Sequence, residues 1–590
     1  TVVENQVYSY FVDEVIEEAL ADLTEYYISE GYTEDQAAAK ASSMIYTGGL
    51  SIYTTQDPQI QAIADEVIAD ESFYPENTRW LLSYRLTITK ADGTIENHST
   101  EMFKTYYKQF DGNFNLLYNS QEEAYAAIEQ YTAAVLEEGD EITAENITLT
   151  AQPQISLTIE DQSTGYVLAI VGGRGQKVTS RSLNRATNTK RQPGSCFKVL
   201  AAFAPAVDTG TLTLASVYED APYNYANGRP IKNWYNDYWG ICSIRYGVEQ
   251  SLNIIAVKTI TQITPQVGFN YLKNFGFTTL VDRRVESNGM VTTDITQSLA
   301  LGGLTDGVKN IELNAAYAAI ANGGIYNEPI LYTKIVDHDG NVLIDKVAEQ
   351  QTRRVLQDTT AFLMTSAMID CVSRGTGTAA NFGTQRIAGK TGTTSDNYDV
   401  WFAGYTPYYT CTTWVGYDNN TSMNASEKAI VKAVWREVML RIHEGLEYRD
   451  FPMPGNITTC TVCSQSGLLP IEGLCDATLR TEYFADGTAP TTYCNVHYAG
   501  DVCAYSLKMA CPGCPFKVPG VLTLPLVEDS SLAGGYVYRD GDGNVVSTAN
   551  TTNYCEHDAL FFTNPGYLGI LEAENAILQS QGFNFSLEGY

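Results

Sequence analysis

The sequence has 590 residues, 44% of them apolar and 18% charged, and these proportions exclude an intrinsically disordered chain. A formal net charge of −32, from 37 basic and 69 acidic residues, argues against nucleic acid as a partner, because phosphate contacts need clustered lysine and arginine. No stretch approaches the roughly eighteen apolar residues of a membrane span, and the chain opens without an initiator methionine. We therefore expect several globular domains that belong to a longer protein.

Helices and one strand are predicted before residue 72. Apolar residues at helical spacing predict a helix over 10–23, and Thr33 with Gln36 can cap a second helix over 37–44. Residues 48–55 have the composition of a strand, and Asp57-Pro58 can open a third helix that runs to about Asp70.

Residues 73–150 differ in character from their neighbours in the chain. Segments 83–89 and 94–99 flank a turn at 90–93 and predict a hairpin, while Ser120 can cap an alanine-rich helix to residue 136, with Glu123 completing a capping box. No chemistry is evident here. We interpret the region as a small α+β pedestal rather than a binding module.

The strands over 154–159 and 166–171 should begin a second sheet, and a helix with apolar residues at 197, 199, 200 and 203 follows Pro193-Gly194. Ser195 lies in the first turn of that helix, where unpaired N–H groups and the helix dipole favour negative charge. Lys198 lies on the same face three residues later. The pair can act as nucleophile and base if burial or a nearby cation keeps the lysine partly neutral.

Two further motifs occur later in the chain. They are Ser251-Leu252-Asn253 and Lys390-Thr391-Gly392-Thr393-Thr394. Each motif alone is weak, since 182–184 also has the Ser-x-Asn pattern but precedes Ser195. The set of three resembles penicillin-binding proteins and class A β-lactamases.

Longer stretches resemble the transpeptidase domain of class A penicillin-binding proteins: 184–186 with 191–194, 300–303, 315–317, 322–324, 387–394, 399–407 and 414–417. The resemblance covers roughly 50 to 448, apart from 73–150. The sequence departs from it at Cys196, where threonine or serine is common, and at Val199, where proline is common.

The resemblance implies an α+β fold of the penicillin-binding-protein and serine β-lactamase type, with an antiparallel sheet flanked by helices. It implies a serine D,D-transpeptidase that cross-links peptidoglycan stem peptides through an acyl-enzyme on Ser195 and is inhibited covalently by β-lactams. Lys198 would be the general base, Ser251 a proton relay, Asn253 a ligand of the substrate's peptide group, and Lys390 a fixed positive charge. No cofactor or metal is implied for this reaction.

The resemblance also assigns substrate binding to Thr391, Gly392, Thr393 and Thr394, and an oxyanion hole to the backbone N–H groups of Ser195 and Thr393. Cys196 is a competing nucleophile, but neighbouring helical residues point about 100° apart, so only one of them can face Lys198. We interpret Cys196 as a small buried residue.

Two alternatives remain. A β-lactamase-type hydrolase or D,D-carboxypeptidase uses the same motifs, although no loop in this sequence is identifiable as the source of a base for water. A non-catalytic β-lactam-binding sensor or scaffold is the other. The five histidines fit no Ser-His-Asp arrangement and are interpreted as surface or loop residues.

The region after 448 holds eight of the twelve cysteines. The pairs Cys460/Cys463 and Cys511/Cys514 invite a zinc interpretation, with His497 and His557 nearby, but disulfides are favoured because the resemblance places the chain outside the reducing cytosol. The pairing stays open. Residues 540–544 resemble half an EF-hand loop, lack its later glycine and glutamate, and are interpreted as a hairpin turn.

These observations predict five segments: a linker over 1–49, the start of the transpeptidase region over 50–72, the pedestal over 73–150, the catalytic domain over 151–448 and a cysteine-rich module over 449–590. The linker resembles the segment that comes after the glycosyltransferase domain of class A proteins, so we expect that domain and a membrane anchor to be missing here. The expected location is the extracellular face of the bacterial cytoplasmic membrane. The expected partners are stem peptides, β-lactams and proteins of cell-wall synthesis.

Overall fold

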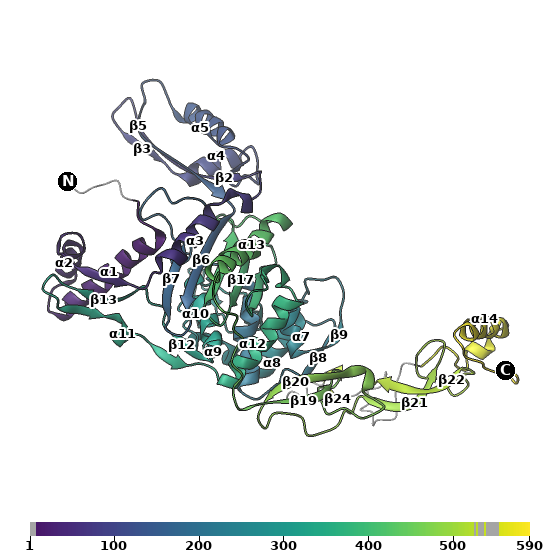
Figure 1. The fold of residues 1–590 in the computed structure, drawn as a ribbon. Coiled ribbons are helices and arrows are strands. Elements are labelled where there is room, and N and C mark those ends of the chain that lie inside the picture. Colours follow the sequence, from purple (N-terminus) through teal and green to yellow (C-terminus); the bar gives the residue numbers. More distant parts are fainter. Residues whose placement is uncertain (1–6, 524–526, 529–535, 538–553) are drawn as a thin grey trace. The chain divides into compact units, whose positions relative to one another are not determined.

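The computed structural model describes residues 7–523, 527–528, 536–537 and 554–590, so the predicted turn at 540–544 lies outside the described residues (Figure 1). The chain forms two compact units. One contains residues up to 205, 248–251 and 264–453, and the other contains 206–247, 252–263 and 454–590.

The first unit is built on a five-stranded antiparallel sheet with strand order β16-β17-β18-β6-β7. Its members are β6 (Gln154–Asp161), β7 (Tyr166–Val171), β16 (Ala388–Thr393), β17 (Asp399–Tyr405) and β18 (Thr410–Gly416). The predicted strands at 154–159 and 166–171 are thereby confirmed. Helices α3 (Pro58–Ala69), α10 (Asn310–Ala321) and α13 (Ala425–Ile442) pack on the sheet, so the predicted α+β fold with a helix-flanked antiparallel sheet is also confirmed (Figure 1).

Strand β6 shows why both faces of this sheet are covered. Ile155, Leu157 and Ile159 point into one apolar core that also contains α3 and α13 side chains. The alternate residues are polar yet buried, and Ser156 and Glu160 among them contact α10. Because buried polar groups need partners, α10 supplies amides: Asn310 donates to Ser156 Oγ at 3.2 Å, and Asn314 donates to Glu160 Oε2 at 3.1 Å.

The predicted elements near the N-terminus are present. They are α1 (Tyr10–Ser29), α2 (Glu34–Thr47), β1 (Ser51–Thr54) and α3. Thr33 and Gln36 form the predicted capping box, and Asp57 caps α3 with Pro58 as its first residue. Strand β1 pairs with β13 (Tyr332–Val336), which pairs with β14 (Val342–Asp345), so this segment joins the first unit through a small sheet of its own.

The pedestal is a small sheet with two helices. Its elements are β2 (Arg79–Thr89), β3 (Ile95–His98), α4 (Thr100–Lys108), β4 (Leu117–Tyr118), α5 (Gln121–Val135) and β5 (Glu141–Gln152). The predicted hairpin at 83–99 is confirmed by the β2–β3 pairing. Ser120 caps α5, but the carboxylate of Glu123 accepts from Asn119 N rather than completing the predicted box with Ser120. Tyr84, Phe103 and Tyr131 form its separate core.

Short elements complete the first unit. They are the 3₁₀ turn η1 (Glu71–Phe73), the helical run η2 (Gly194–Cys196) and η3 (Lys198–Phe203), then α9 (Pro265–Asn274), β10 (Arg284–Val285), β11 (Val291–Thr292), η4 (Gln297–Leu301), β12 (Ile325–Asn327), α11 (Lys346–Glu349), β15 (Thr352–Arg354), α12 (Asp358–Ser373) and η5 (Thr378–Ala380). The helical run continues into α6 (Ala204–Asp208), which begins in the first unit and ends in the second.

The second unit combines two internal segments of the chain with its C-terminal part. Its elements are β8 (Val217–Asp220), β9 (Gly240–Ser243), α7 (Ile244–Glu249), α8 (Asn253–Ile263), β19 (Ile457–Cys463), η6 (Asp476–Thr478), β20 (Leu479–Ala485), β21 (His497–Cys503), β22 (Lys517–Thr523), β23 (Val527–Glu528), β24 (Tyr536–Val537), η7 (Phe561–Thr563) and α14 (Tyr567–Ser580). Arg245 forms a buried ion pair with Glu482 of β20, with Nε lying 2.8 Å from Oε2. Ala215, Val462 and Phe484 form a small core beside it.

The predicted disulfides are not found among the described residues, which include every cysteine of the sequence. All twelve cysteines are unpaired, although eleven of them are buried. The sulfur atoms of the C-terminal part gather in two clusters with histidines instead.

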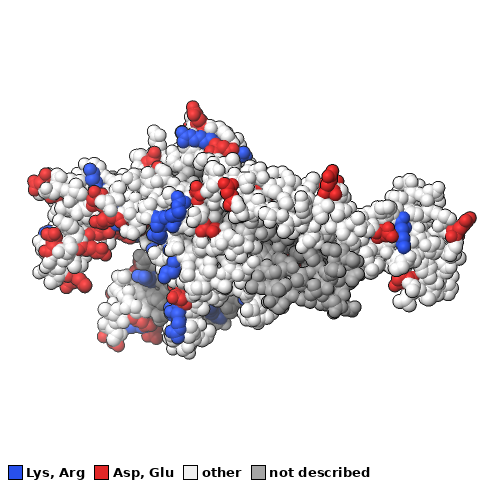
Figure 2. Space-filling model, turned by 90° about the horizontal axis from the view of Figure 1, so that it is seen from below, with Lys and Arg blue, Asp and Glu red and all other residues white. Residues whose placement is uncertain are grey.

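The surface carries the acidic excess of the sequence. Figure 2 shows acidic side chains gathered at the left of the view, where α1 and α2 lie. The exposed acidic residues of these helices are Glu17, Glu25, Glu34 and Asp35. Within the described residues, no helix combines the length and apolar character that crossing a membrane requires.

Glu160 makes the stability of the first unit depend on pH. Burial raises its pKa from 4.5 to about 8, so the folded state holds a proton that the unfolded state has released above pH 4.5. The contribution of protonated Glu160 to the free energy of unfolding is complete below pH 4.5. It is lost as pH rises from 4.5 to 8, at about 1.4 kcal/mol per pH unit. We expect Glu160→Gln to have little effect near pH 5 and to raise the melting temperature relative to the parent chain at pH 8. Calorimetry at both pH values measures this. Glu138→Gln, on the exposed pedestal surface, is the control, and identical pH dependence in both variants would contradict the prediction.

Candidate active site

Ser195 lies in a helical run that is less regular than the sequence predicts. A 3₁₀ turn (η2) holds Ser195, a π-helical segment (η3) begins at Lys198, and only α6 is α-helical. The expected amphipathic α-helix is therefore wrong in type, although the segment is helical. Ser195 thus lies in the 3₁₀ turn and Lys198 lies three residues later, at the start of the π-helical segment.

The turn rests directly on the edge strand β16. A Cβ atom on Gly392 would lie 2.5 Å from the carbonyl oxygen of Pro193, and one on Gly194 would lie 2.8 Å from the carbonyl oxygen of Thr393. Only residues without side chains allow this backbone approach. The two glycines therefore fix the distance between the turn that carries Ser195 and the strand that carries Lys390.

Long-range hydrogen bonds anchor the segment around this turn. Arg191 Nε lies 2.6 Å from Asp399 Oδ1, and Trp414 Nε1 donates to the same oxygen at 2.9 Å. The Trp401 indole donates to the carbonyl of Gln192 at 2.8 Å. These contacts come from strands β17 and β18, so the sheet itself fixes the approach to Ser195.

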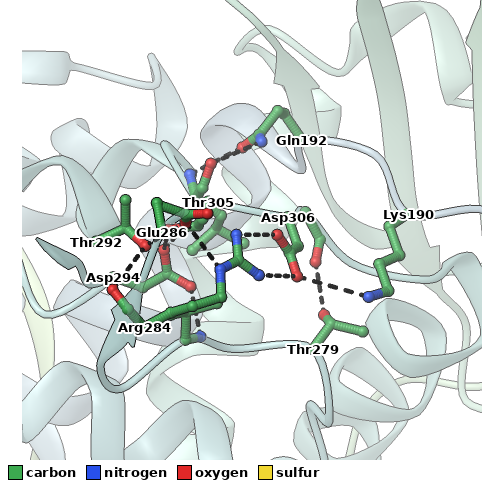
Figure 3. A network of polar contacts seen from close by, with 12 residues as sticks. Lys190, Gln192, Thr279, Arg284, Glu286, Thr292, Asp294, Thr305 and Asp306 are labelled. Carbon is green, nitrogen blue, oxygen red and sulfur yellow. Dashed lines mark hydrogen bonds and ion pairs between the residues drawn. The ribbon is translucent and has the colours of Figure 1, made fainter. Parts of the chain in front are cut away.

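A polar network supports the turn from the other side (Figure 3). The side chain of Gln192 donates to the carbonyl of Leu304 and accepts from its N–H, both at 2.8 Å. Gly302 packs on Gly194 so closely that a Cβ would lie 2.4 Å from the Gly194 oxygen, and its φ is +70°. The 300–303 stretch is therefore a support for the nucleophile turn.

Charged groups hold that support in place. Arg284 pairs with Asp306 through two N–H groups at 2.9 and 3.0 Å and with Glu286 at 2.9 Å, and Lys190 lies 3.6 Å from Asp306 (Figure 3). Asp294 accepts from both the N–H and the hydroxyl of Thr305 at 2.7 Å.

Two buried lysines meet at the hydroxyl of Ser251. Lys198 Nζ lies 3.1 Å from Ser251 Oγ and donates to its carbonyl at 2.5 Å, while Lys390 Nζ lies 2.8 Å from the same Oγ. Both lysine side chains have 0% exposure. Ser251 has φ +57°, an uncommon backbone conformation for a residue other than glycine.

The same geometry determines the charge of the two amines. Burial, and then the positive charge of Lys390, lower the pKa of Lys198 well below its ordinary value. Burial also lowers the pKa of Lys390. A neutral Lys198 amine has a lone pair that can accept a proton, which is the condition that a general base must meet.

The predicted substrate-binding strand is β16 with the turn after it. The hydroxyls of Thr391 and Thr376 are hydrogen-bonded at 2.8 Å, and Thr393 is exposed at the end of the strand. The Thr394 hydroxyl accepts from the N–H groups of Tyr398 and Asp399, both at 3.1 Å. Thr394 therefore shapes the turn, whereas Thr391 and Thr393 face outward from the strand region.

Asn253 lies at the start of α8 in the second unit, two residues after Ser251 in the chain. Its side-chain amide donates to the carbonyl of Lys232 at 2.6 Å. The structure thus brings Lys198, Ser251 and Lys390 together within the first unit, whereas Asn253 belongs to the second unit.

Some residues around the site were missed by sequence reasoning. Thr376, which contacts Thr391, comes after a glycine in the run Arg374-Gly375-Thr376-Gly377, and that glycine-rich composition was the available signal. The interpretation of the histidines as surface or loop residues is wrong for His98 and His497, which are buried in strands β3 and β21, whereas His443 and His557 are buried but lie outside helices and strands. His497 and His557 join the cysteine clusters.

Cys196 is a buried residue with a weakly acidic thiol. It has 0% exposure, its Sγ donates to the Lys390 carbonyl at 3.6 Å, and burial raises its pKa to about 12. The side chain of the neighbouring Ser195 is only half-buried. These observations agree with the interpretation of Cys196 as packing rather than as a nucleophile.

We expect iodoacetamide at pH 8 to leave Cys196 unmodified in the folded chain, because only the thiolate reacts and burial suppresses it. Cys460, which is partly exposed, is the internal comparison and should react readily. Peptide mass spectrometry measures both, and both should react after denaturation. Native alkylation of Cys196 at the rate of Cys460 would show that its thiol is accessible and ionised, contrary to this expectation.

Comparisons with known proteins agree with the geometry. The family model described as penicillin binding protein transpeptidase domain matches residues 155–440, and the model described as penicillin-binding protein 1A, C-terminal domain, matches residues 453–499. The chain is 34% identical over 373 residues to penicillin-binding protein 1A of Clostridium botulinum (strain Hall). This match covers 61% of this chain and 44% of the relative. It is 32% identical over 433 residues to penicillin-binding protein 1A of Clostridium tetani. This match covers 70% of this chain and 52% of the relative.

The chain thus spans about half the length of the curated relatives it matches. The crystal structure of penicillin-binding protein 1A from Haemophilus influenzae has the same fold, with a TM-score of 0.57 and 22% identity over 83% of this chain and 77% of that chain. Fold, family models and relatives agree with the resemblance found in the motifs. The chain belongs to the class A penicillin-binding proteins and carries their transpeptidase domain.

Proposed function

We propose that this chain is a serine D,D-transpeptidase that cross-links peptidoglycan stem peptides through an acyl-enzyme on Ser195. The observation that carries the proposal is the meeting of Lys198 and Lys390 at Ser251 Oγ, beside the turn that holds Ser195. Two buried amines around one hydroxyl leave Lys198 able to accept a proton. Membership of the transpeptidase family supports the same chemistry.

In the first step the neutral amine of Lys198 takes the hydroxyl proton of Ser195 as Oγ attacks the carbonyl carbon of the penultimate D-alanine. The negative charge that develops on the carbonyl oxygen is held by the N–H groups of Ser195 and Thr393. The C–N bond then breaks, and the departing D-alanine amine receives a proton through Ser251. An amine from a neighbouring stem attacks the ester and returns the proton to Ser195.

Substrate binding uses the edge strand. Strand β16 is the outermost strand of the sheet, and a peptide can add to such an edge through backbone hydrogen bonds. Thr391, Gly392, Thr393 and Thr394 would line it, and Lys390 would attract the terminal carboxylate. Asn253 would hold the peptide group of the stem.

A β-lactam would acylate Ser195 by the same first step and remain attached. The cell envelope is the place of action, and we propose that the chain faces the outside of the cytoplasmic membrane, anchored there by a part of the protein other than these residues. Its partners would be stem peptides and proteins of cell-wall synthesis.

We expect a fluorescent penicillin to label the chain with one equivalent on Ser195, because the neutral amine of Lys198 would take the proton of the Ser195 hydroxyl and so activate it as a nucleophile. Peptide mass spectrometry locates the adduct, and Ser195→Ala should remove it, whereas Ser182→Ala, in the out-of-order Ser-x-Asn match, should not. An adduct elsewhere would reject the assignment. Turnover of many equivalents would indicate a hydrolase, and labelling without acyl transfer to an amine acceptor would indicate a sensor.

The two lysines should differ in their effect on pH dependence. Acylation should rise with pH through the lowered pKa of Lys198, so Lys198→Ala should slow it by on the order of 10²–10⁴-fold at every pH. Lys390→Ala removes a positive charge and lets the pKa of Lys198 rise. It should slow acylation by roughly 10²-fold and shift the pH optimum upward, although burial still lowers that pKa.

The second-order acylation rate measured against pH separates these outcomes. Lys104→Ala in the pedestal, where the lysine has only a 3.9 Å contact with Glu101, is the matched control and should leave the profile unchanged. A Lys390→Ala profile with an unshifted optimum would restrict Lys390 to substrate binding.

A further inference from the structure

Four buried side chains meet at the end of the β19–β20 hairpin: Cys463, Cys475, Cys494 and His497. Their ligand atoms all lie within 4.8 Å of one another. His497 Nδ1 is 3.4 Å from Cys463 Sγ, 3.4 Å from Cys475 Sγ and 3.5 Å from Cys494 Sγ. Zn–S bonds of about 2.3 Å and a Zn–N bond of about 2.0 Å at tetrahedral angles place nitrogen and sulfur about 3.5 Å apart. The cluster therefore has the size of a tetrahedral zinc site.

A second cluster has the same composition. Cys503, Cys514, Cys555 and His557 are buried, and their ligand atoms also lie within 4.8 Å of one another. His557 Nδ1 is 3.6 Å from Cys503 Sγ and 3.4 Å from Cys514 Sγ. The opposite ring nitrogen, Nε2, donates to Glu574 of α14 at 2.7 Å. That bond places the ring proton on Nε2 and directs the lone pair of Nδ1 at the sulfurs, as a carboxylate does behind a metal-bound histidine.

The two clusters share one backbone plan. Cys463 and Cys503 each end the first strand of a hairpin, and each N–H bonds to the carbonyl five residues later, at 2.8 and 2.9 Å. Cys494 N–H bonds to Leu469 at 2.7 Å, and Cys555 N–H bonds to Met509 at the same distance. The C-terminal part thus contains a repeated unit.

The repeat is visible in the sequence once the structure aligns it. A tyrosine, a cysteine and then a histidine occur as Tyr493-Cys494-Asn495-Val496-His497 and as Tyr554-Cys555-Glu556-His557. Backbone N–H groups also point at sulfur in both: Ile471 N–H at Cys475 Sγ and Cys511 N–H at Cys555 Sγ, each at 3.3 Å. Such bonds favour the thiolate form that a metal requires.

Disulfides fit these clusters poorly. Each contains three cysteines and one histidine, so one disulfide would leave a single buried thiol beside an imidazole in each cluster. The Cys-x-x-Cys pairs that the sequence suggested are also divided, because Cys460 and Cys511 belong to neither set of four. A single ion, by contrast, uses all four side chains of a cluster at once.

We infer that residues 454–590 bind two structural zinc ions, one in each Cys₃His cluster. Three thiolates with one imidazole favour Zn²⁺ over oxygen-seeking Mg²⁺ or Ca²⁺. Four protein ligands leave no open position, so the ions are structural rather than catalytic. Each binding event displaces the protons of the three thiols and leaves a site charge of −1.

The test is metal analysis of the whole chain, purified with zinc and then dialysed against metal-free buffer. Inductively coupled plasma mass spectrometry should find two zinc ions per chain. Cys475→Ser and Cys514→Ser should each hold one, and the double variant none. Cys460→Ser and Cys511→Ser are the matched controls, since they remove neighbouring thiols outside the clusters, and both should retain two.

A second measurement does not depend on variants that could fail to fold. Chain refolded with Co²⁺ in place of zinc should show the intense visible bands of tetrahedral cobalt with thiolate ligands, at two equivalents. Intact mass after denaturation without reductant should equal that of twelve free thiols. Fewer than two ions in the parent chain, octahedral cobalt spectra, or a mass lowered by disulfide formation would each overturn the proposal.

Discussion

The structure around Ser195 depends on two buried lysine amines, those of Lys198 and Lys390, which both contact the hydroxyl of Ser251. Burial removes water that would stabilise an ammonium ion, and a second positive charge a few ångströms away disfavours it further. The pKa of Lys198 is therefore lowered by burial first and by Lys390 second. Lys198 can act as the proposed base only while both amines remain buried and near one another. The surrounding fold must therefore hold the two side chains in these positions.

The fold meets that requirement through backbone contacts rather than through the flexible lysine side chains. Gly194 and Gly392 let the nucleophile turn touch strand β16, and Gly302 lets the supporting loop touch Gly194. Asp399 and Gln192 then lock the turn to the sheet and to that loop. A side chain at Gly194 or Gly392 would push the nucleophile turn away from the strand that carries Lys390, and one at Gly302 would push the supporting loop away from the turn. The positive φ of Ser251 belongs to the same arrangement, since it sets the direction of the shared hydroxyl.

The sequence was sufficient to predict most of the local elements around the site. The irregular helix and the long-range contacts could not be predicted from it, for physical reasons. Features that depend on local sequence pattern were predictable, and the structure contains them. Examples are the capping box of Thr33 with Gln36 and the strands at 154–159 and 166–171. The irregular helix at Lys198 was not predictable, because apolar spacing over a few residues does not distinguish π from α geometry. The Arg191–Asp399 pair joins residues 208 positions apart, so no local pattern contains it. The two cysteine-histidine clusters could not be predicted from Cys-x-x-Cys spacing, because their members lie up to 34 and 54 positions apart in the chain.

The C-terminal hairpins show why those cysteines matter physically. The core of the first cluster is Cys463, Cys475, Cys494 and Val496, and a two-stranded hairpin with so little apolar surface is marginal in water. A four-coordinate ion would supply the missing stability, and its binding energy would then be folding energy. The first hairpin is also tied to the Arg245–Glu482 pair, and Ala215 packs with Val462 in the same unit. Arg245 and Ala215 both belong to segment 206–247, so metal binding at the first cluster would also stabilise the packing of this internal segment within the second unit.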